Sequence, residues 1–240
     1  MNPVKTQLKR GLYLSPGFYM HYWVNCIERN YSVDVIARHG KLKQHREVWI
    51  GAILAAWQTK VSGIKHFVGI PEREPPDVEI VRYERIVTPS GRVGTKMGKI
   101  GFELTRCSMD DGETIFEQIL KKNKHANKNI SLVIYTYGSN VETDFNALQK
   151  EIDSLSLIYP HEIIVAGPVL GTKKIKFPIG TFGITKLYPT KGQDTVSLND
   201  LGSFFMSPNL KIPTGLGVSS QAKRLGQIEL MPPIIKGKKI

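Results

Sequence analysis

Residues 75–81 read PPDVEIV, and residues 100–106 read IGFELTR. Apolar and polar side chains alternate in both segments, as they do in strands that cover a core with one face. The interval between them is rich in Gly and contains Pro and Ser, which favours a turn. The two segments are therefore predicted to pair as a β-hairpin, with strands over 78–87 and 99–105 and a loop at 88–94.

An acidic residue lies at each predicted strand. Asp77 opens the first strand, and Glu103 lies inside the second, on the face opposite Phe102 and Leu104. A hairpin would bring the two carboxylates together, where a hard divalent cation needs only a few such oxygens with water and a phosphate. Glu47, on a preceding helix, is a third candidate ligand. The ordinary alternative is that these acids lie on a solvated face and bind nothing.

The neighbouring segments predict a mixed α/β fold. Residues 44–59 and 112–124 have the apolar pattern of helices before and after the hairpin. Residues 130–137 form a nearly continuous apolar run, typical of a central strand covered on both faces and parallel to its neighbour. A helix over 143–155 and a buried strand over 162–166 follow. This order predicts a mixed β-sheet with a central hairpin flanked by helices.

Three parts are expected along the 240 residues. Residues 1–43 are aromatic-rich and irregular and form an N-terminal extension. Residues 44–170 carry the α/β core. Residues 171–240 are rich in Gly and Pro and form an irregular, β-rich and basic C-terminal extension.

The chain carries 33 basic and 21 acidic side chains, a net charge of +12. This surplus favours a polyanionic partner, and nucleic acid is preferred over a membrane because no basic amphipathic helix with an aromatic face stands out. Residues 201–240 hold six basic side chains and one acidic side chain. No segment approaches the apolar length of a membrane-spanning helix, so a cytoplasmic protein is expected. The basic candidates for nucleic-acid binding are Arg106, Lys121, Lys223, Arg224, Lys236, Lys238 and Lys239.

The order of elements resembles the restriction-endonuclease-like, PD-(D/E)xK nuclease superfamily. Its core is a helix, an antiparallel hairpin, a helix and a strand. An Asp opens the hairpin, an acid-x-Lys triplet lies on its second strand, and a Glu often lies on the first helix. Pro76-Asp77 matches the first motif, and Glu103-Leu104-Thr105 occupies the place of the triplet. The segment looks like the branch whose triplet is Glu-x-Thr, and the resemblance covers roughly residues 44–166.

The resemblance implies a metal-dependent nuclease that cleaves nucleic-acid phosphodiesters through Asp77 and Glu103. The implied cofactor is Mg²⁺ or Mn²⁺, held by these two carboxylates with assistance from Glu47. The implied substrate is nucleic acid, with DNA preferred over RNA, and a homo-oligomer is compatible with it.

The chain departs from the superfamily at Thr105, where a lysine usually stands. One interpretation moves the lysine to the next helix. There Lys122 lies on the flank of the apolar stripe with Gln118 one turn earlier, and Lys121 points farther out. Gln118 and Lys122 would then orient water or phosphate. Another is that catalysis was lost and binding kept, and the ordinary alternative is that Lys121 and Lys122 form a solvated face.

Two other functions stay open. The chain could be a catalytically inactive nucleic-acid-binding or assembly protein on the same fold. It could also be a protein-interaction module whose positive charge serves an acidic partner. Salt-dependent affinity for nucleic acid separates the first of these from the second.

Overall fold

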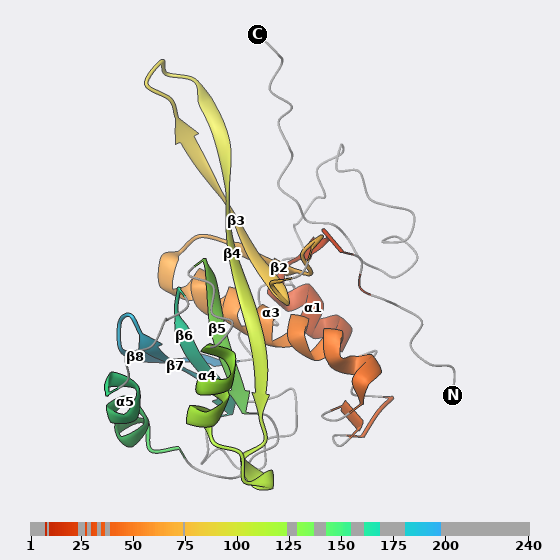
Figure 1. Cartoon of the computed structure of the whole chain (residues 1–240). Helices are drawn as coiled ribbons and strands as arrows, with labels where there is room; N and C mark the ends of the chain where they lie inside the picture. Colours follow the sequence, from red (N-terminus) through yellow and green to blue (C-terminus); the bar gives the residue numbers. More distant parts are fainter. Residues whose placement is uncertain are drawn as a thin grey trace.

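An antiparallel hairpin lies in the middle of the sheet, as the alternating segments predict (Figure 1). β3 (Val78–Val87) pairs with β4 (Val93–Cys107), and the register runs from Val78 opposite Phe102 to Val87 opposite Val93. The computed structural model describes residues 8, 10–23, 27, 30–32, 35–36, 39–73, 75–123, 129–136, 143–154, 161–168 and 181–197.

The second strand of the hairpin is longer than expected, because β4 begins at Val93. The glycines that suggested a long loop lie within the ladder, with Gly94 opposite Ile86 and Gly98 opposite Arg82. A Cβ added at Gly98 would lie 3.2 Å from Arg82 Nε, and one at Gly94 would lie 3.6 Å from Ile86 Cγ1. Larger side chains of β3 therefore cover the glycines of β4, and the ladder continues where the glycine content suggested a loop.

The sheet is mixed, and its eight described strands follow one another in chain order. β4, β5 and β6 are parallel neighbours, whereas the pairs on either side of them are antiparallel. The expected central parallel strand at 130–137 is confirmed as β5. The remaining elements are β1 (Tyr13–Leu14), α1 (Pro16–Trp23), η2 (Gly40–Leu42), α3 (Lys43–Ser62), β2 (His66–Gly69), η3 (Met109–Asp111), α4 (Ile115–Asn123), β5 (Ile130–Thr136), α5 (Phe145–Asp153), β6 (Ile163–Pro168), β7 (Thr181–Tyr188) and β8 (Gly192–Ser197).

Helices cover both faces of this sheet, which makes the described fold α/β (Figure 1). α1 and α3 pack on one face, in a core that includes Trp23, Trp49 and Phe102. α4 and α5 pack on the other face, in a second core that includes Ile119 and Ile134. The two apolar faces of β5 explain why this strand carries no charged side chain.

The sheet curls around α3. This helix contacts β2 near one edge of the sheet and β8 at the other edge. Trp49 packs edge-on against Phe182 of β7, with ring centroids 5.0 Å apart. Farther along α3, Trp57 Nε1 donates a hydrogen bond to Asp194 of β8 over 3.2 Å. α3 therefore joins the first half of the chain to its last described strand.

Local signals in the sequence set the helix ends. α3 stops at Gly63, whose φ of 70° is left-handed and whose N–H donates to Thr59. α4 begins with a reciprocal capping box in which Thr114 and Glu117 each accept a hydrogen bond from the other's backbone N–H. Asp144 caps α5 by accepting from two backbone N–H groups. The capping box fixes where α4 begins, and with it which side chains this helix presents to β4.

Both terminal segments that the sequence sets apart from the core contribute to the same sheet. Residues 1–43 provide β1 and α1, and residues 171–240 provide β7 and β8. Among the described residues, no helix is long and apolar enough to cross a membrane.

Candidate functional site

Asp77 lies directly opposite Glu103, one pair beyond the end of the β3–β4 register. Its backbone N–H donates to Phe102 O over 3.0 Å, and its Oδ2 accepts from the N–H of Leu104 over 2.8 Å. Asp77 thus continues the ladder with its side chain as well as its backbone. A Cβ at Gly101 would lie 2.8 Å from Pro76 Cγ, so the glycine is what allows the Pro-Asp segment to lie beside β4. The hairpin therefore brings Asp77 and Glu103 together, as expected.

Lys122 reaches the same place from α4. Its Nζ lies 2.7 Å from Glu103 Oε1, and both side chains are about one-third exposed. Lys121 is exposed on the outer side of the helix. Gln118, one turn before Lys122, is buried. The expectation that Lys122 rather than Lys121 reaches the hairpin is confirmed in its geometry.

Glu47 approaches Asp77 from the opposite face of the sheet. It lies on α3 and is only 6% exposed. Lys43, one turn earlier, lies between the two acids, with its Nζ 3.2 Å from Glu47 Oε1 and 4.0 Å from Asp77 Oδ1. Because Asp77 stands at the open end of β3, it can be reached from the α3 face and from the α4 face. We call Glu47, Asp77 and Glu103 the carboxylate cluster.

Burial, together with neighbouring negative charge, raises the pKa of two acids of the carboxylate cluster. Burial raises the pKa of Glu47 from 4.5 to about 7, the negative charge of Asp77 adds to the rise, and Lys43 opposes it. Burial also raises the pKa of Asp77, the hydrogen bond from Leu104 opposes this, and the charge of Glu103 raises it further. The repulsion of Glu47 by Asp77 and of Asp77 by Glu103 is relieved by a cation, so the cluster favours binding of positive charge.

The donor set limits which metal site is available here. Within the described residues, no group of three or more His, Cys, Asp and Glu side chains is placed to hold a metal ion. A Mg²⁺ ion, however, is commonly held by one or two carboxylates, with waters and a substrate phosphate filling its other positions. Asp77 and Glu103 fit that smaller set, and Glu47 lies next to them as a third acid.

Net charge supports the same fit. If all three acids of the cluster are ionised, Lys43 and Lys122 offset two of the three negative charges. The cluster then has a net charge of −1, and a divalent cation would change it to +1. A phosphodiester carries one negative charge, so the loaded cluster would match its charge.

Several residues near the carboxylate cluster were not predicted from the sequence as part of the site. Lys43 is one, although its i,i+4 spacing from Glu47 is a readable signal of an ion pair. Arg46 and Tyr135 are others: Arg46 is buried, and its Nη1 donates to Ile36 O and His39 O over 2.7 and 3.0 Å. Burial raises the pKa of Tyr135, and the positive charge of Arg46 and a hydrogen bond to it oppose the rise. The contact between Arg46 and Tyr135 joins segments far apart in the chain, so no local pattern marks it.

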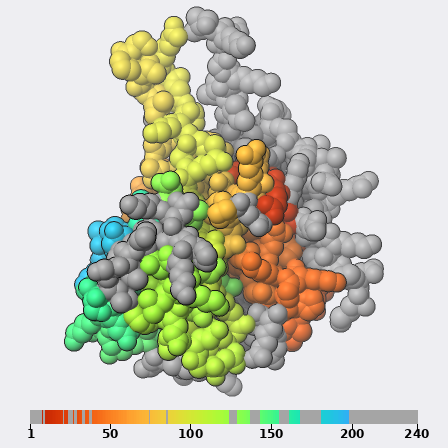
Figure 2. All heavy atoms as spheres, in the orientation of Figure 1, coloured from red at the N-terminus to blue at the C-terminus, as the bar shows by residue number. Residues whose placement is uncertain are grey.

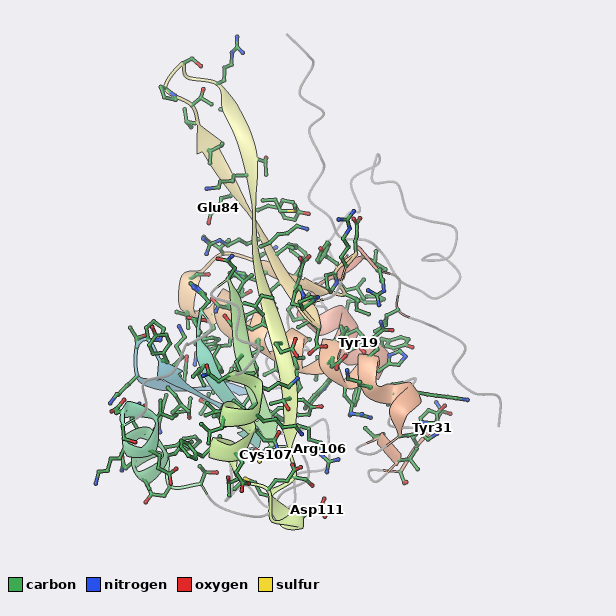
Figure 3. All side chains as sticks on the ribbon, viewed as in Figure 1. Tyr19, Tyr31, Glu84, Arg106, Cys107 and Asp111 are labelled. Atoms are coloured by element: carbon green, nitrogen blue, oxygen red, sulfur yellow. The ribbon has the colours of Figure 1, made fainter. Side chains whose placement is uncertain are left out.

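The candidate nucleic-acid-binding residues fall in different places. Arg106 is half-buried near the end of β4 and donates from Nη2 to Ser108 Oγ over 3.0 Å (Figure 3). The C-terminal basic residues expected to contribute, Lys223, Arg224, Lys236, Lys238 and Lys239, lie outside the described residues.

Glu79, the other acid at the start of β3, takes no part in the carboxylate cluster. It accepts hydrogen bonds from the hydroxyl of Tyr13 and from Lys99 Nζ, the latter over 3.3 Å.

No family model, curated protein or solved structure matches this chain. The site is therefore defined by its own geometry: two carboxylates paired across β3 and β4, a third acid on α3, and one lysine from each covering helix.

Proposed function

We propose that the protein is a metal-dependent nuclease that hydrolyses nucleic-acid phosphodiesters, with Asp77 and Glu103 at its centre. The proposal includes a restriction-endonuclease-like identity for the core formed by α3, β3, β4, α4 and β5. Support comes from the order of these elements and from the acids they carry. Glu47 is on the first helix, Asp77 opens the hairpin, and Glu103 is on its second strand.

The observation that carries the proposal is the 2.7 Å contact between Lys122 Nζ and Glu103 Oε1. Thr105 stands where a lysine of the nuclease motif would be, and Lys122 brings an ammonium group to the same carboxylate from α4. A fixed positive charge beside a phosphate stabilises the negative charge that develops in the transition state. Lys122 would therefore supply electrostatic stabilisation that the triplet itself lacks.

The residues of the cluster divide the remaining work. The N–H of Leu104 holds Oδ2 of Asp77 by a hydrogen bond. The other carboxylate oxygen of Asp77, Oδ1, points toward Lys43. Glu47, whose pKa of about 7 in the metal-free protein would be lowered by a cation, would assist the two carboxylates as a third ligand. A bound Mg²⁺ or Mn²⁺ would supply polarisation of the phosphate and a more acidic water.

The test is cleavage of duplex and single-stranded nucleic acids by the full chain with added Mg²⁺ or Mn²⁺. We expect Asp77→Asn and Glu103→Gln to lower the cleavage rate at least ~100-fold, because each removes a charge from the centre. Glu162→Gln is the matched control, since Glu162 is also paired with a lysine, Lys186, at 2.5 Å, but lies away from the cluster, directly before β6. Equal rates for Glu103→Gln and Glu162→Gln would contradict the proposal.

A second candidate is a nucleic-acid-binding protein on the same fold that does not cleave. Thr105 in place of the lysine favours it, as does the lack of a three-ligand group among the described residues. Such a protein would bind nucleic acid in a salt-dependent way, and its wild type would cut no substrate with either metal. A Thr105→Lys variant that gains cleavage would then identify a site that had lost its lysine.

A further inference from the structure

The distal part of the β3–β4 hairpin projects from the body as a two-stranded ribbon. β2 pairs with β3 only as far as Arg82, and β5 pairs with β4 only from Gly101 onward. Residues 83–97 therefore have only each other as strand neighbours. Together with the flanking residues 82, 98 and 99, we call them the arm. Figures 1 and 2 show the arm standing beyond the rest of the described residues.

The tip of the arm is a well-defined turn. The N–H of Thr88 donates to Arg92 O over 2.8 Å, and the N–H of Arg92 donates back to Thr88 Oγ1 over 3.1 Å. The N–H of Gly91 donates to Thr88 O over 2.8 Å, with a left-handed φ of 74°. These bonds satisfy the backbone at the turn, so the end of the arm has a fixed shape to present to a partner.

The arm is strongly basic. It contains five basic side chains, namely Arg82, Arg85, Arg92, Lys96 and Lys99, and one acidic side chain, Glu84. Arg82 pairs with Glu84 over 2.7 Å, and Lys99 pairs with Glu79 over 3.3 Å (Figure 3 labels Glu84). Arg92 and Lys96 are exposed near the tip, and no ion pair holds either of them among the described residues. Their charges are therefore available to an anionic partner.

Exposed apolar side chains flank the same turn. Val87 and Val93 form the last pair of the ladder, and they are 67% and 56% exposed. Ile86 and Met97 are exposed as well. Small apolar groups beside basic ones suit the grooves of nucleic acid, where they contact thymine methyl groups or base edges.

We propose that the arm is a binding ribbon for duplex DNA, placed in a groove about one helical turn from the cleaved position. The inference rests on the proposed function, because it names duplex DNA as the substrate class of that site. The major groove of B-form DNA, about 12 Å wide, admits a two-stranded β-ribbon. The deep, narrow major groove of A-form RNA does not admit side chains. The charge of the arm complements the phosphates on both sides of the groove.

The spacing between the arm and the carboxylate cluster fits one duplex. Asp77 directly precedes β3, and Val87 ends it, so the ten residues of β3 separate the two. At a rise of about 3.3 Å per residue, they span about 33 Å. One turn of B-form DNA is about 34 Å long. A duplex whose phosphate lies at the carboxylate cluster can therefore present a groove to the tip of the arm about one turn away.

The test is the affinity of the full chain for a duplex of about 20 base pairs, which is about two helical turns. Fluorescence anisotropy is measured with EDTA present, so that binding is read without cleavage. The probes are the DNA duplex, its single strand, and an RNA duplex of the same sequence. The Arg92→Ala/Lys96→Ala double variant removes two charges from the arm. Lys150→Ala/Lys191→Ala removes two exposed charges from α5 and the β7–β8 turn and serves as the control.

We expect the arm variant to bind the DNA duplex about tenfold more weakly and to lower the slope of log affinity against log salt by about two. The control should bind like the wild type, and the wild type should prefer duplex DNA to both other probes. A second variant replaces residues 84–96 with Asn-Gly, joining Tyr83 to Met97, which are already paired. It should lose the duplex preference and leave the melting temperature of the body unchanged.

Equal affinities of the two double variants would overturn the proposal. So would a wild-type dimer in sedimentation that becomes monomeric on shortening the arm with unchanged DNA affinity, because the arm would then bind a second copy of the chain. Failure of the nuclease proposal looks different. A protein that never cuts but loses duplex binding in the arm variants keeps the arm assignment, whereas normal cutting and binding by those variants removes only the arm.

Discussion

The two ends of the β3–β4 hairpin have opposite surroundings. At one end, Asp77 and Glu103 lie between α3 and α4, where burial and repulsion raise the pKa values of two of the clustered acids. At the other end, Val87 and Val93 stand in solvent on a ribbon with no third strand. One continuous ladder joins them, so the ladder holds the arm at a fixed spacing from the carboxylate cluster. At the inner end, burial shifts the pKa values of charged groups. At the outer end, the basic side chains are exposed and can bind an anionic partner.

The largest difference between the two ends should be in stability. Phe102 is fully buried beside the cluster, and Phe102→Ala should lower the free energy of unfolding by about 4 kcal/mol through lost burial and a cavity. Met97→Ala, in the arm, should change it by less than about 0.5 kcal/mol because Met97 is exposed. Urea unfolding of both variants measures the two values. Similar costs would mean that the arm packs against something in solution.

The pH dependence of stability should also be centred at the inner end. The pKa of Glu47 is raised from 4.5 in the unfolded chain to about 7, so folding favours its protonated form. This contribution is fully present below pH 4.5 and is lost as the pH rises through 7. Wild type should therefore lose about 3 kcal/mol relative to Glu47→Gln across this range, at about 1.4 kcal/mol per pKa unit.

Urea unfolding of wild type and Glu47→Gln at a series of pH values checks this expectation. Below pH 4.5, the difference between the two proteins should be constant, which provides an internal control. Parallel stability curves up to pH 8 would show that Glu47 is solvated more fully than its 6% exposure implies.

A smaller effect is expected from the lysine at the inner end. Lys122→Met should lower the cleavage rate about 100-fold with little change in binding, because its charge acts on the transition state. Lys121→Met, which removes the adjacent exposed charge, should lower the rate less than about threefold. Single-turnover rates and equilibrium binding of both variants are the measurements. Equal losses of cleavage rate in the two variants would mean that Lys122 contributes only to the overall positive charge of the surface and has no specific role at the cluster.

The smallest effect is expected at the tip of the arm. Gly91 has a φ of 74° and open space where a Cβ would lie, so Gly91→Ala meets backbone strain alone, about 1 kcal/mol. Since the ribbon has few contacts with the body, it should open locally. Amide hydrogen exchange in the arm should rise about fivefold, with an unchanged melting temperature. In the Gly91→Asn variant, amide hydrogen exchange in the arm should rise less, because Asn tolerates this conformation. A lowered melting temperature would show that the arm unfolds with the body.

Features with a short-range signal were predictable from the sequence. The period-two alternation around Asp77 and Glu103 predicted their opposition, and the helical angle between Gln118 and Lys122 predicted which lysine reaches the hairpin. The apolar run at 130–137 predicted the parallel strand. Each of these depends on the geometry of a single element or on one adjacent pair of strands.

Features made by distant contacts were not predictable in this way. Gly94 and Gly98 read as a loop because their covering side chains, Ile86 and Arg82, come from the other strand. The pairing of β7 and β8 onto the core sheet depends on packing against α3, and no periodicity in residues 181–197 shows it. The position of Lys43 between Glu47 and Asp77 depends equally on how α3 crosses the sheet.

The contact of α3 with β8 has a consequence for synthesis on the ribosome. Each described strand pairs with the strand just before it, so every new strand finds its neighbour already made as the chain emerges. Trp57 and Lys60 of α3, however, can bond to Asp194 only after β8 has been made. Asp194 is 134 residues after Lys60, whose Nζ lies 2.6 Å from its carboxylate. Until then, one side of α3 stays uncovered. A nascent chain that stalls before β8 would therefore leave this side of α3 exposed and open to chaperones, and β8 is the last described strand to cover it.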